Sequence, residues 1–396
     1  MANKPKIRFK GFDDAWEQRK FSDVAARESF VSTSASDVPS VEYEDVVAEE
    51  GRLNKDIRLK EAVKSGITFD GSQVLYGKLR PYLHNWLNPD FKGIAVGDWW
   101  VLKPINMEKN FLYRLIQTQQ FDNIANQSSG SKMPRADWNL ISNSQFVVPF
   151  SKEEQSKIGG YFDNIDHLIT LHQRKCDQMN ELKKYMLTKM FPQNGSKVPE
   201  IRFDGYTDDW EQRKLGELAE IVGGGTPSTS MGSYWDGDID WYAPAEIGEQ
   251  IYLESSQRKI TEKGLNKSSA KILPIGTVLF TSRAGIGKTA ILLKEGCTNQ
   301  GFQSIVPNKE KLDSYFIFTR SEELKRYGET VGAGSTFAEV SGKQMADMEL
   351  MMPKTTLEQQ QIGEYFSKLD HLITLHQHKC NELREIKKYM LKNMFI

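Results

Sequence analysis

The chain has 396 residues, and its 52 Lys and Arg residues against 53 Asp and Glu residues give a formal net charge of −1. A chain of this length is too long for one ordinary core, so we expect two domains of fewer than ~200 residues each. With 39% hydrophobic and 27% charged residues, the composition is typical of a soluble globular protein, and no apolar run reaches the ~20 residues of a membrane helix.

The start of the chain, Met1–Pro5, leads into charged and aromatic residues without an apolar stretch. We therefore expect no secretory signal and a cytoplasmic location. Three cysteines without a CxxC pair agree with a reducing compartment. The near-neutral charge counts against a nucleic-acid-binding protein, because phosphate contacts need Lys and Arg, although local patches or partner subunits can supply these cations.

Two blocks of the sequence occur twice. Pro5–Lys20 returns as Pro199–Lys214 at an offset of 194, and Glu154–Phe191 returns as Glu358–Phe395 at an offset of 204. The second block includes an identical run of eight residues that begins at Asp166 and again at Asp370. The sequence therefore indicates a tandem duplication.

Between these blocks the two halves diverge and keep only a faint skeleton, such as Gly97 with Gly301. Identical frames with different inserts suit a protein that presents two different recognition surfaces in one geometry. A purely structural duplication that has drifted is the alternative.

The divergent parts, residues 21–150 and 215–353, contain short β-rich runs punctuated by Gly, Pro and Asn, together with helical patterns. Each is expected to form a mixed α/β domain, which makes the fold class α+β. The predicted boundaries, in chain order, are 1–150 for the first domain, 151–191 for a long helix, 192–198 for a linker, 199–353 for the second domain and 354–396 for a second long helix.

The repeated second block predicts the two long helices, because apolar residues recur every three or four positions over about 35 residues. At 1.5 Å a residue each helix is a rod of about 50 Å, too long to pack inside one small domain. We expect the two helices to bury their stripes on each other as an antiparallel coiled-coil pair. The predicted interface residues are Ile165, Leu168, His172, Met179, Leu182, Leu369, Leu372, His376, Leu383 and Ile386.

Three motifs carry a family resemblance: the repeated Trp-Glu-Gln-Arg-Lys at Trp16 and Trp210, the stretch Gly223–Ser230 followed by Tyr234–Trp241, and the Pro-x-x-x-x-Glu-Gln lead into each long helix. Over essentially its whole length the chain resembles the specificity subunits of type I restriction-modification systems. The resemblance implies two target-recognition domains, each reading one half of a split asymmetric site in double-stranded DNA, with the helices setting the unread spacer.

The resemblance also implies partners. Two methyltransferase subunits that use S-adenosylmethionine would dock on the chain, and two restriction subunits with ATP-driven translocase and nuclease activity would join through them. S-adenosylmethionine, ATP and Mg are expected on these partners, and no cofactor, metal or catalytic residue is expected on this chain.

Residues near inferred strand ends and loops are the candidate DNA contacts, because Arg and Lys read guanine in the major groove and other cationic groups grip phosphates. In the first domain the candidates are Lys78, Arg80, Lys132 and Arg135. In the second domain they are Ser282, Arg283, Lys288 and Thr336.

Other motifs favour catalysis only weakly. Arg283–Thr289 resembles the end of a phosphate-binding loop, but Ser282 stands where that loop needs glycine. Asn88–Phe91 resembles an amino-methyltransferase tetrapeptide without its second proline and is interpreted as a turn, and Pro89-Asp90 with Glu181 and Lys183 resembles a nuclease motif only by coincidence.

The pairs His172/Cys176 and His376/Cys380 lie four residues apart near the helix midpoints, so antiparallel packing could gather a zinc site; packing of these side chains in a helix interface is favoured instead. Two other classes of function stay open. One is a self-sufficient enzyme that binds and modifies DNA, and the other is a tandem protein-binding module that never touches DNA.

Overall fold

The computed structural model describes residues 4–127, 133–193, 195–283, 285–333 and 339–396. The chain divides into two compact units: the first is Met1–Lys175 with His376–Ile396, and the second is Cys176–Leu375. The predicted boundaries treat each long helix as a separate segment, whereas each compact unit includes part of both helices.

The first unit is a mixed α/β domain whose strands form a four-stranded sheet in the order β2-β11-β8-β9, a second in the order β3-β7-β10-β4, and the pairs β1-β12 and β5-β6. The strands are β1 (Glu17–Lys20), β2 (Ala25–Glu28), β3 (Val31–Thr33), β4 (Ser40–Val41), β5 (Val46–Val47), β6 (Arg52–Leu53), β7 (Ser65–Phe69), β8 (Val74–Gly77), β9 (Trp86–Leu87), β10 (Gly93–Ala95), β11 (Trp99–Pro104) and β12 (Gln145–Val148). The short helices are α1 (Phe21–Val24), α2 (Lys109–Leu115), α3 (Gln119–Ala125) and α4 (Trp138–Asn143), with the 3₁₀ turns η1 (Tyr43–Asp45), η2 (Ile57–Leu59) and η3 (Pro81–Leu83).

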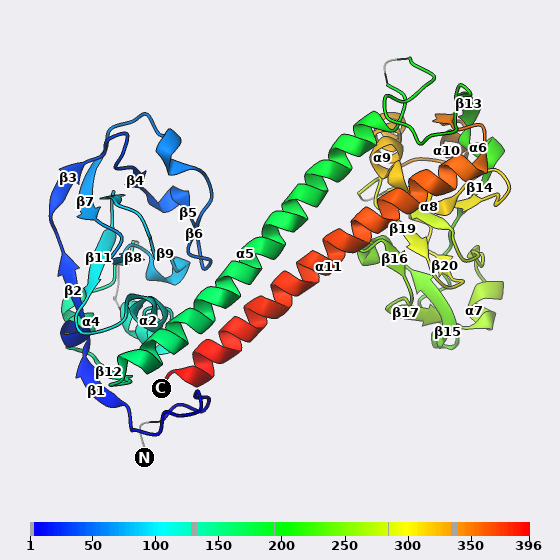
Figure 1. Cartoon of the computed structure of the whole chain (residues 1–396). Helices are drawn as coiled ribbons and strands as arrows, with labels where there is room; N and C mark the ends of the chain where they lie inside the picture. The colour runs from blue at the N-terminus through cyan, green and yellow to red at the C-terminus, as the bar shows by residue number, and fades with distance from the viewer. Residues whose placement is uncertain (1–3, 128–132, 194, 284, 334–338) are drawn as a thin grey trace. The chain divides into compact units, whose positions relative to one another are not determined.

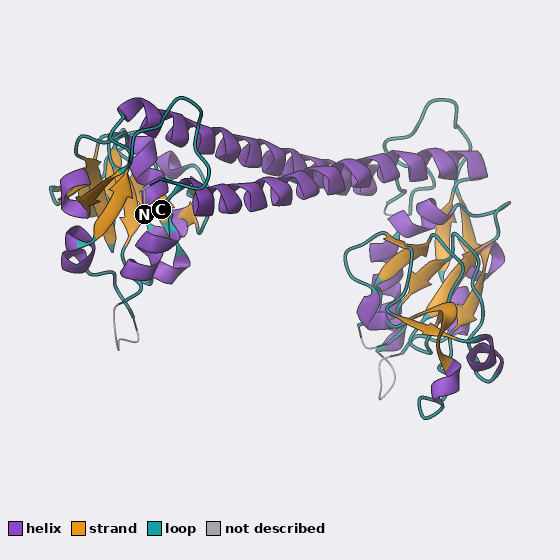
Figure 2. Cartoon of the chain, turned by 90° about the horizontal axis from the view of Figure 1, so that it is seen from below, coloured by secondary structure: helices purple, strands orange, loops and turns teal. Residues whose placement is uncertain are grey.

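The second unit repeats this plan with different sheets: a five-stranded sheet in the order β14-β21-β18-β19-β16, a three-stranded sheet β17-β15-β20 and the pair β13-β22. The strands are β13 (Glu211–Lys214), β14 (Ala219–Gly223), β15 (Trp235–Tyr242), β16 (Tyr252–Leu253), β17 (Arg258–Ile260), β18 (Val278–Phe280), β19 (Thr289–Leu292), β20 (Cys297–Thr298), β21 (Gln303–Pro307) and β22 (Glu349–Met352). The short helices are α6 (Leu215–Leu218), α7 (Glu262–Asn266), α8 (Ser314–Thr319), α9 (Ser321–Gly332) and α10 (Gly342–Ala346), with the 3₁₀ turns η4 (Gly232–Tyr234) and η5 (Pro244–Glu246). Figure 2 shows strands and short helices in both units.

The two long helices are α5 (Lys152–Lys189) and α11 (Thr356–Met394). In the first unit the beginning of α5 lies beside the end of α11, and in the second unit the end of α5 lies beside the beginning of α11 (Figure 1). Residue numbers rise along one helix as they fall along the other, so the helices run antiparallel within each unit. The predicted α+β fold with an antiparallel helix pair is confirmed.

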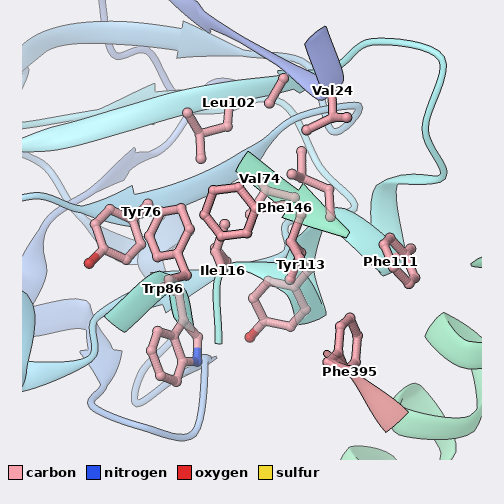
Figure 3. Close-up of a cluster of buried hydrophobic side chains, with 14 of the residues drawn as sticks. Val24, Val74, Tyr76, Trp86, Leu102, Phe111, Tyr113, Ile116, Phe146 and Phe395 are labelled. Carbon is pink, nitrogen blue, oxygen red and sulfur yellow. The ribbon is translucent and has the colours of Figure 1, made fainter. Parts of the chain in front are cut away.

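The residues that follow the C-terminal end of each long helix pack into an aromatic core. Phe395, directly after α11, stacks on Phe111 with ring centres 5.2 Å apart (Figure 3). Its ring centre also lies 6.3 Å from that of Trp16, edge-on, and 6.3 Å from that of Phe162, at a tilt. The core of the first unit is therefore completed by the last residues of α11.

The second unit has the same arrangement. Phe191, two residues after α5, lies 5.9 Å from Trp210, 5.7 Å from Phe316 and 6.2 Å from Phe366, ring centre to ring centre. The duplication thus extends to how each domain receives a helix end. None of the helices within the described ranges combines the length and the apolar content that crossing a membrane requires.

Candidate DNA interface

The repeated opening motif ties each domain to the start of a long helix. Arg8 donates to both carboxylate oxygens of Glu154 at 2.6 and 2.9 Å, and Trp16 Nε1 donates to the same carboxylate at 3.2 Å. The copy repeats this geometry: Arg202 donates to Glu358 at 2.7 and 2.9 Å, and Trp210 at 3.2 Å. A buried carboxylate needs such bidentate pairing. This need explains why the opening motif and the start of the long helix recur together in both halves of the chain.

The helix pair has a stricter period than the sequence pattern suggested. Its central residues are spaced alternately four and three apart, which is the heptad spacing of a coiled coil. All of them are buried or half-buried: on α5 Ile158, Phe162, Ile165, Ile169, His172, Cys176, Met179, Lys183 and Met186, directly after it Met190, and on α11 Ile362, Phe366, Leu369, Ile373, His376, Cys380, Leu383, Lys387, Met390 and Met394.

Six predicted interface residues lie on this spacing: Ile165, His172, Met179, Leu369, His376 and Leu383. The prediction is wrong for Leu168, Leu182, Leu372 and Ile386, whose side chains are 41%, 43%, 38% and 37% exposed. Each of these four directly precedes a central position, so it lies about 100° around the helix from the seam.

Both charged central positions are paired. Lys387 Nζ lies 2.7 Å from Asp166 in the first unit, and Lys183 Nζ lies 2.6 Å from Asp370 in the second. Asp370 also accepts a hydrogen bond from Tyr315 Oη at 2.8 Å. Apolar spacing does not predict these ion pairs, although the Lys and the Asp both recur at the offset of 204.

Two imidazoles meet at the end of the helix pair in the first unit, where His172 Nδ1 lies 2.8 Å from His376 Nδ1. Burial, followed by the proximity of His376, lowers the pKa of His172. Cys380 instead directs its Sγ at the Ile169 carbonyl oxygen at 3.5 Å. Among the described residues no group of three or more His, Cys, Asp or Glu side chains is arranged to hold a metal ion.

The exposed apolar residues of the long helices form a repeated surface, which we name the apolar flank. In the first unit it consists of Leu168 and Leu171 on α5 with Ile386 and Tyr389 on α11, which are 37–59% exposed. In the second unit the copies at the same offset, Leu372, Leu375, Leu182 and Tyr185, are 38–54% exposed. They occupy the same two heptad positions in both helices, so within each unit they lie on one side of the pair.

In the first domain, the structure gathers the predicted DNA contacts where β8 ends. Arg135 Nη2 lies 3.0 Å and Lys78 Nζ 3.5 Å from the carboxylate of Asp98. The hydrogen bond from Arg135 lowers the pKa of Asp98. Arg80 is exposed, and Lys132 lies outside the described residues.

The backbone of this loop is fixed from several sides. Leu79 and Arg135 form an isolated β-bridge, and Arg80 N donates to Pro134 O at 2.7 Å. Leu79 N donates to Tyr43 Oη at 3.0 Å, and that hydroxyl donates to Asp98 O at 2.6 Å. The loop therefore has a defined shape. Tyr43 and Asp98 are missed by sequence reasoning because both lie far from the loop in the chain.

The equivalent loop of the second domain follows β18, where an isolated bridge joins Arg283 to Glu339, the same positions after the offset of 204. Ser282 is completely buried, so its predicted contact with DNA is wrong. Ser282 N donates a hydrogen bond to Gly301 O, and Ser282 O accepts one from Val340 N. These backbone bonds hold Ser282 inside the domain. Lys288 is exposed, Arg283 is half-buried, and Thr336 lies outside the described residues.

This second loop is not a phosphate-binding loop of the nucleotide-binding type. Such a loop leads into a helix whose first N–H groups face the phosphates. Here the strand β19 begins at Thr289. The loop is a β-hairpin connection, in which Lys288 N donates to Thr281 Oγ1 at 2.9 Å.

Comparison with known proteins finds a family model that matches part of this chain. Residues 207–385 match the family model described as Type I restriction modification DNA specificity domain. These residues cover the second domain and much of α11. The chain thus carries a domain of this family, and the resemblance noted in the sequence is confirmed.

Three relatives illustrate the likeness. The chain is 37% identical over 191 residues to the type I restriction enzyme MjaIX specificity subunit of Methanocaldococcus jannaschii, a match that covers 48% of this chain and 44% of the relative. The match to the MjaVIII specificity subunit of the same organism is 20% identical and covers 82% of this chain and 76% of that one. A crystal structure of a type I restriction-modification system S subunit from M. genitalium has a TM-score of 0.67 at 13% identity, covering 99% of both chains.

The MjaIX match spans about half the length of that relative. The structural match extends the shared fold to the whole chain. The shared fold extends over the chain, whereas the family model matches residues 207–385.

Proposed function

We propose that the chain is the DNA-specificity subunit of a type I restriction-modification complex, in which each domain reads one half of a split, asymmetric DNA site. The observation that carries this proposal is the pair of equivalent loops. The loops follow the equivalent strands β8 and β18, and equivalent bridges close them, at Leu79–Arg135 and Arg283–Glu339. Their side chains differ, as two different half-sites require.

The chain's net charge of −1 is compatible with this role because the cations are local. Arg80 and Lys288 are exposed at the two loops. Partner subunits supply much of the remaining phosphate contact, so the chain alone binds DNA weakly and with a strong dependence on salt.

The two apolar flanks fit two copies of one partner, because each unit presents the same four residue positions. Eight exposed large apolar side chains on a helix pair favour a protein interface. We assign the flanks to the two methyltransferase subunits, and restriction subunits join through these. The partners hold S-adenosylmethionine, ATP and Mg, and the chain itself is non-catalytic and needs no cofactor.

We also assign the length of the unread spacer to the helix pair, since each helix is a single uninterrupted element of 38 or 39 residues. Inserting one heptad into both helices keeps the apolar seam in phase. This insertion lengthens the spacer of the methylated site while both half-sites stay the same.

Replacing residues 21–150 by those of a relative tests modular reading. The chimaera, expressed with its methyltransferase subunit, is expected to change one half of the methylated motif and to leave the other half as it was. A change in both halves contradicts modular reading. DNA that stays unbound by the wild-type complex favours the alternative of a protein-binding module.

A further inference from the structure

The segment Arg80–His84 of the first domain has an unusual backbone. Arg80 and His84 both adopt left-handed conformations, with φ of 49° and 53°, on either side of the 3₁₀ turn η3. Residues with a Cβ avoid this region, and local strain of this kind gathers at functional sites. The equivalent loop of the second domain reaches positive φ with Gly285 and Gly287 instead. Glycine would relieve the strain in the first domain too. The presence of Arg80 and His84 at these positions therefore indicates that their side chains have a function.

Both ends of the segment are anchored. Arg80 N is bonded to Pro134 O, as described above, and His84 contacts two carboxylates, Asp122 at 2.9 Å and Glu49 at 3.2 Å. The His84 ring also stacks on Trp86 with ring centres 5.3 Å apart. These contacts hold η3 in place and point its exposed residues outward.

The three described cations at this loop differ in their pairing. Lys78 and Arg135 share the carboxylate of Asp98. Arg80 is exposed and has no ion pair or side-chain hydrogen bond to any described residue. A planar guanidinium with free donors matches the O6 and N7 atoms of guanine, which lie at the edge of the major groove.

The residues next to Arg80 suit a base edge as well. Tyr82 is 51% exposed and Leu83 39% exposed, although both are large and apolar. Apolar side chains at such a place contact thymine methyl groups or the base surface. The Leu83 side chain has no hydrogen-bond donor for a phosphate, so its exposure here favours contact with a base.

We propose that Arg80–Leu83 is the base-reading loop of the first domain and that the Arg80 guanidinium reads a guanine. This inference rests on the proposed function and deepens it by naming the reading residue and the base. Lys78 and Arg135 are positioning residues, because both pair with the carboxylate of Asp98.

The test is adenine-methylation mapping by long-read sequencing of host DNA, with the chain expressed beside its methyltransferase subunit. Arg80→Gly removes the guanidinium without adding backbone strain, and Arg80→Lys keeps the charge without the two-pronged donor geometry. Arg58→Gly is the matched control, since Arg58 is another exposed arginine of the same domain.

We expect Arg80→Gly to relax one G·C position in one half of the motif by roughly 5- to 150-fold in methylation preference, and Arg80→Lys to relax it nearly as much. The other half-site and the Arg58→Gly motif stay as in the wild type. An unchanged motif in Arg80→Gly overturns the inference. An equal drop at all sites that Arg80→Lys restores also overturns it, since that result describes a phosphate contact.

If Arg80→Gly abolishes methylation, gel shifts of the complex on duplexes substituted at each base pair decide the matter. A discrimination profile equal to that of the wild type contradicts guanine reading, whereas loss at one G·C pair supports it. Failure of the proposed function looks different, because the wild-type chain then yields no split motif at all.

Discussion

Phe395 offers the sharpest test of how the first domain is built. This side chain is 8% exposed and lies among Trp16, Phe111 and Phe162, although it directly follows the end of α11. Replacing a buried Phe by Ala costs about 3–5 kcal/mol, and the chain end can adjust, so we expect about 3 kcal/mol for Phe395→Ala. In a unit of this size that is a decrease of roughly 6–12 °C in the unfolding temperature.

The assay is thermal and denaturant unfolding of the full chain, in which we expect each of the two units to unfold in its own transition. Phe395→Ala is expected to move only the transition of the first unit, while Phe191→Ala moves that of the second. The neighbouring Ile396 is 44% exposed, and Ile396→Ala is the control with a change within about 0.5 kcal/mol. Equal shifts in both transitions, or none for Phe395→Ala, would refute the packing argument.

Three further predictions concern the helix pair. Because the pKa of His172 is lowered from 6.5 in the folded state, the folded first unit binds fewer protons than the unfolded chain. The contribution of His172 to stability is therefore full above pH 6.5 and declines as the pH falls towards the folded pKa. His172→Gln should flatten this pH dependence in unfolding measurements at stepped pH. Leu168→Asp should change the free energy of unfolding by no more than about 0.5 kcal/mol, yet weaken methyltransferase binding in a pull-down. Ile169→Asp, one residue on, should destabilise the unit by about 3 kcal/mol or more. The reverse order would contradict the assignment of the apolar flank to the methyltransferase subunit. Lys183→Ala should lower the free energy of unfolding by about 2 kcal/mol. This is less than the ~3–5 kcal/mol for breaking a fully buried ion pair, because Tyr315 still donates a hydrogen bond to Asp370. An unfolding curve identical to that of the wild type would show that the ion pair does not stabilise the fold.

The duplication and the long helices were predictable from the sequence because both are local or repeated signals. Apolar spacing identified the helices but could not tell which flank of a broad stripe faces the partner. The spacing therefore predicts Leu168 and Leu372 in the seam, although the seam runs through Ile169 and Ile373. The repeated Lys and Asp residues were the missed signal, since a charge at a central heptad position requires a partner across the seam.

The loop residues show a different limit. The place of Ser282 after a strand predicts a contact with DNA. Small polar residues, however, fit inside a domain as readily as on its surface, and Ser282 is buried. The pairing of Lys78 and Arg135 depends on Asp98, which is brought to the loop by β-sheet pairing across the chain. Sequence spacing contains no information on such contacts, so it could not separate the exposed Arg80 from its paired neighbours.

The central claim is that two unlike loops on one duplicated frame read two unlike DNA sequences. Expressing the wild-type chain with its methyltransferase subunit and mapping methylated adenines in the host DNA tests this most directly. We expect one split motif with two different halves around a spacer of fixed length. Methylation at a continuous or palindromic motif, or at no defined motif, would contradict it.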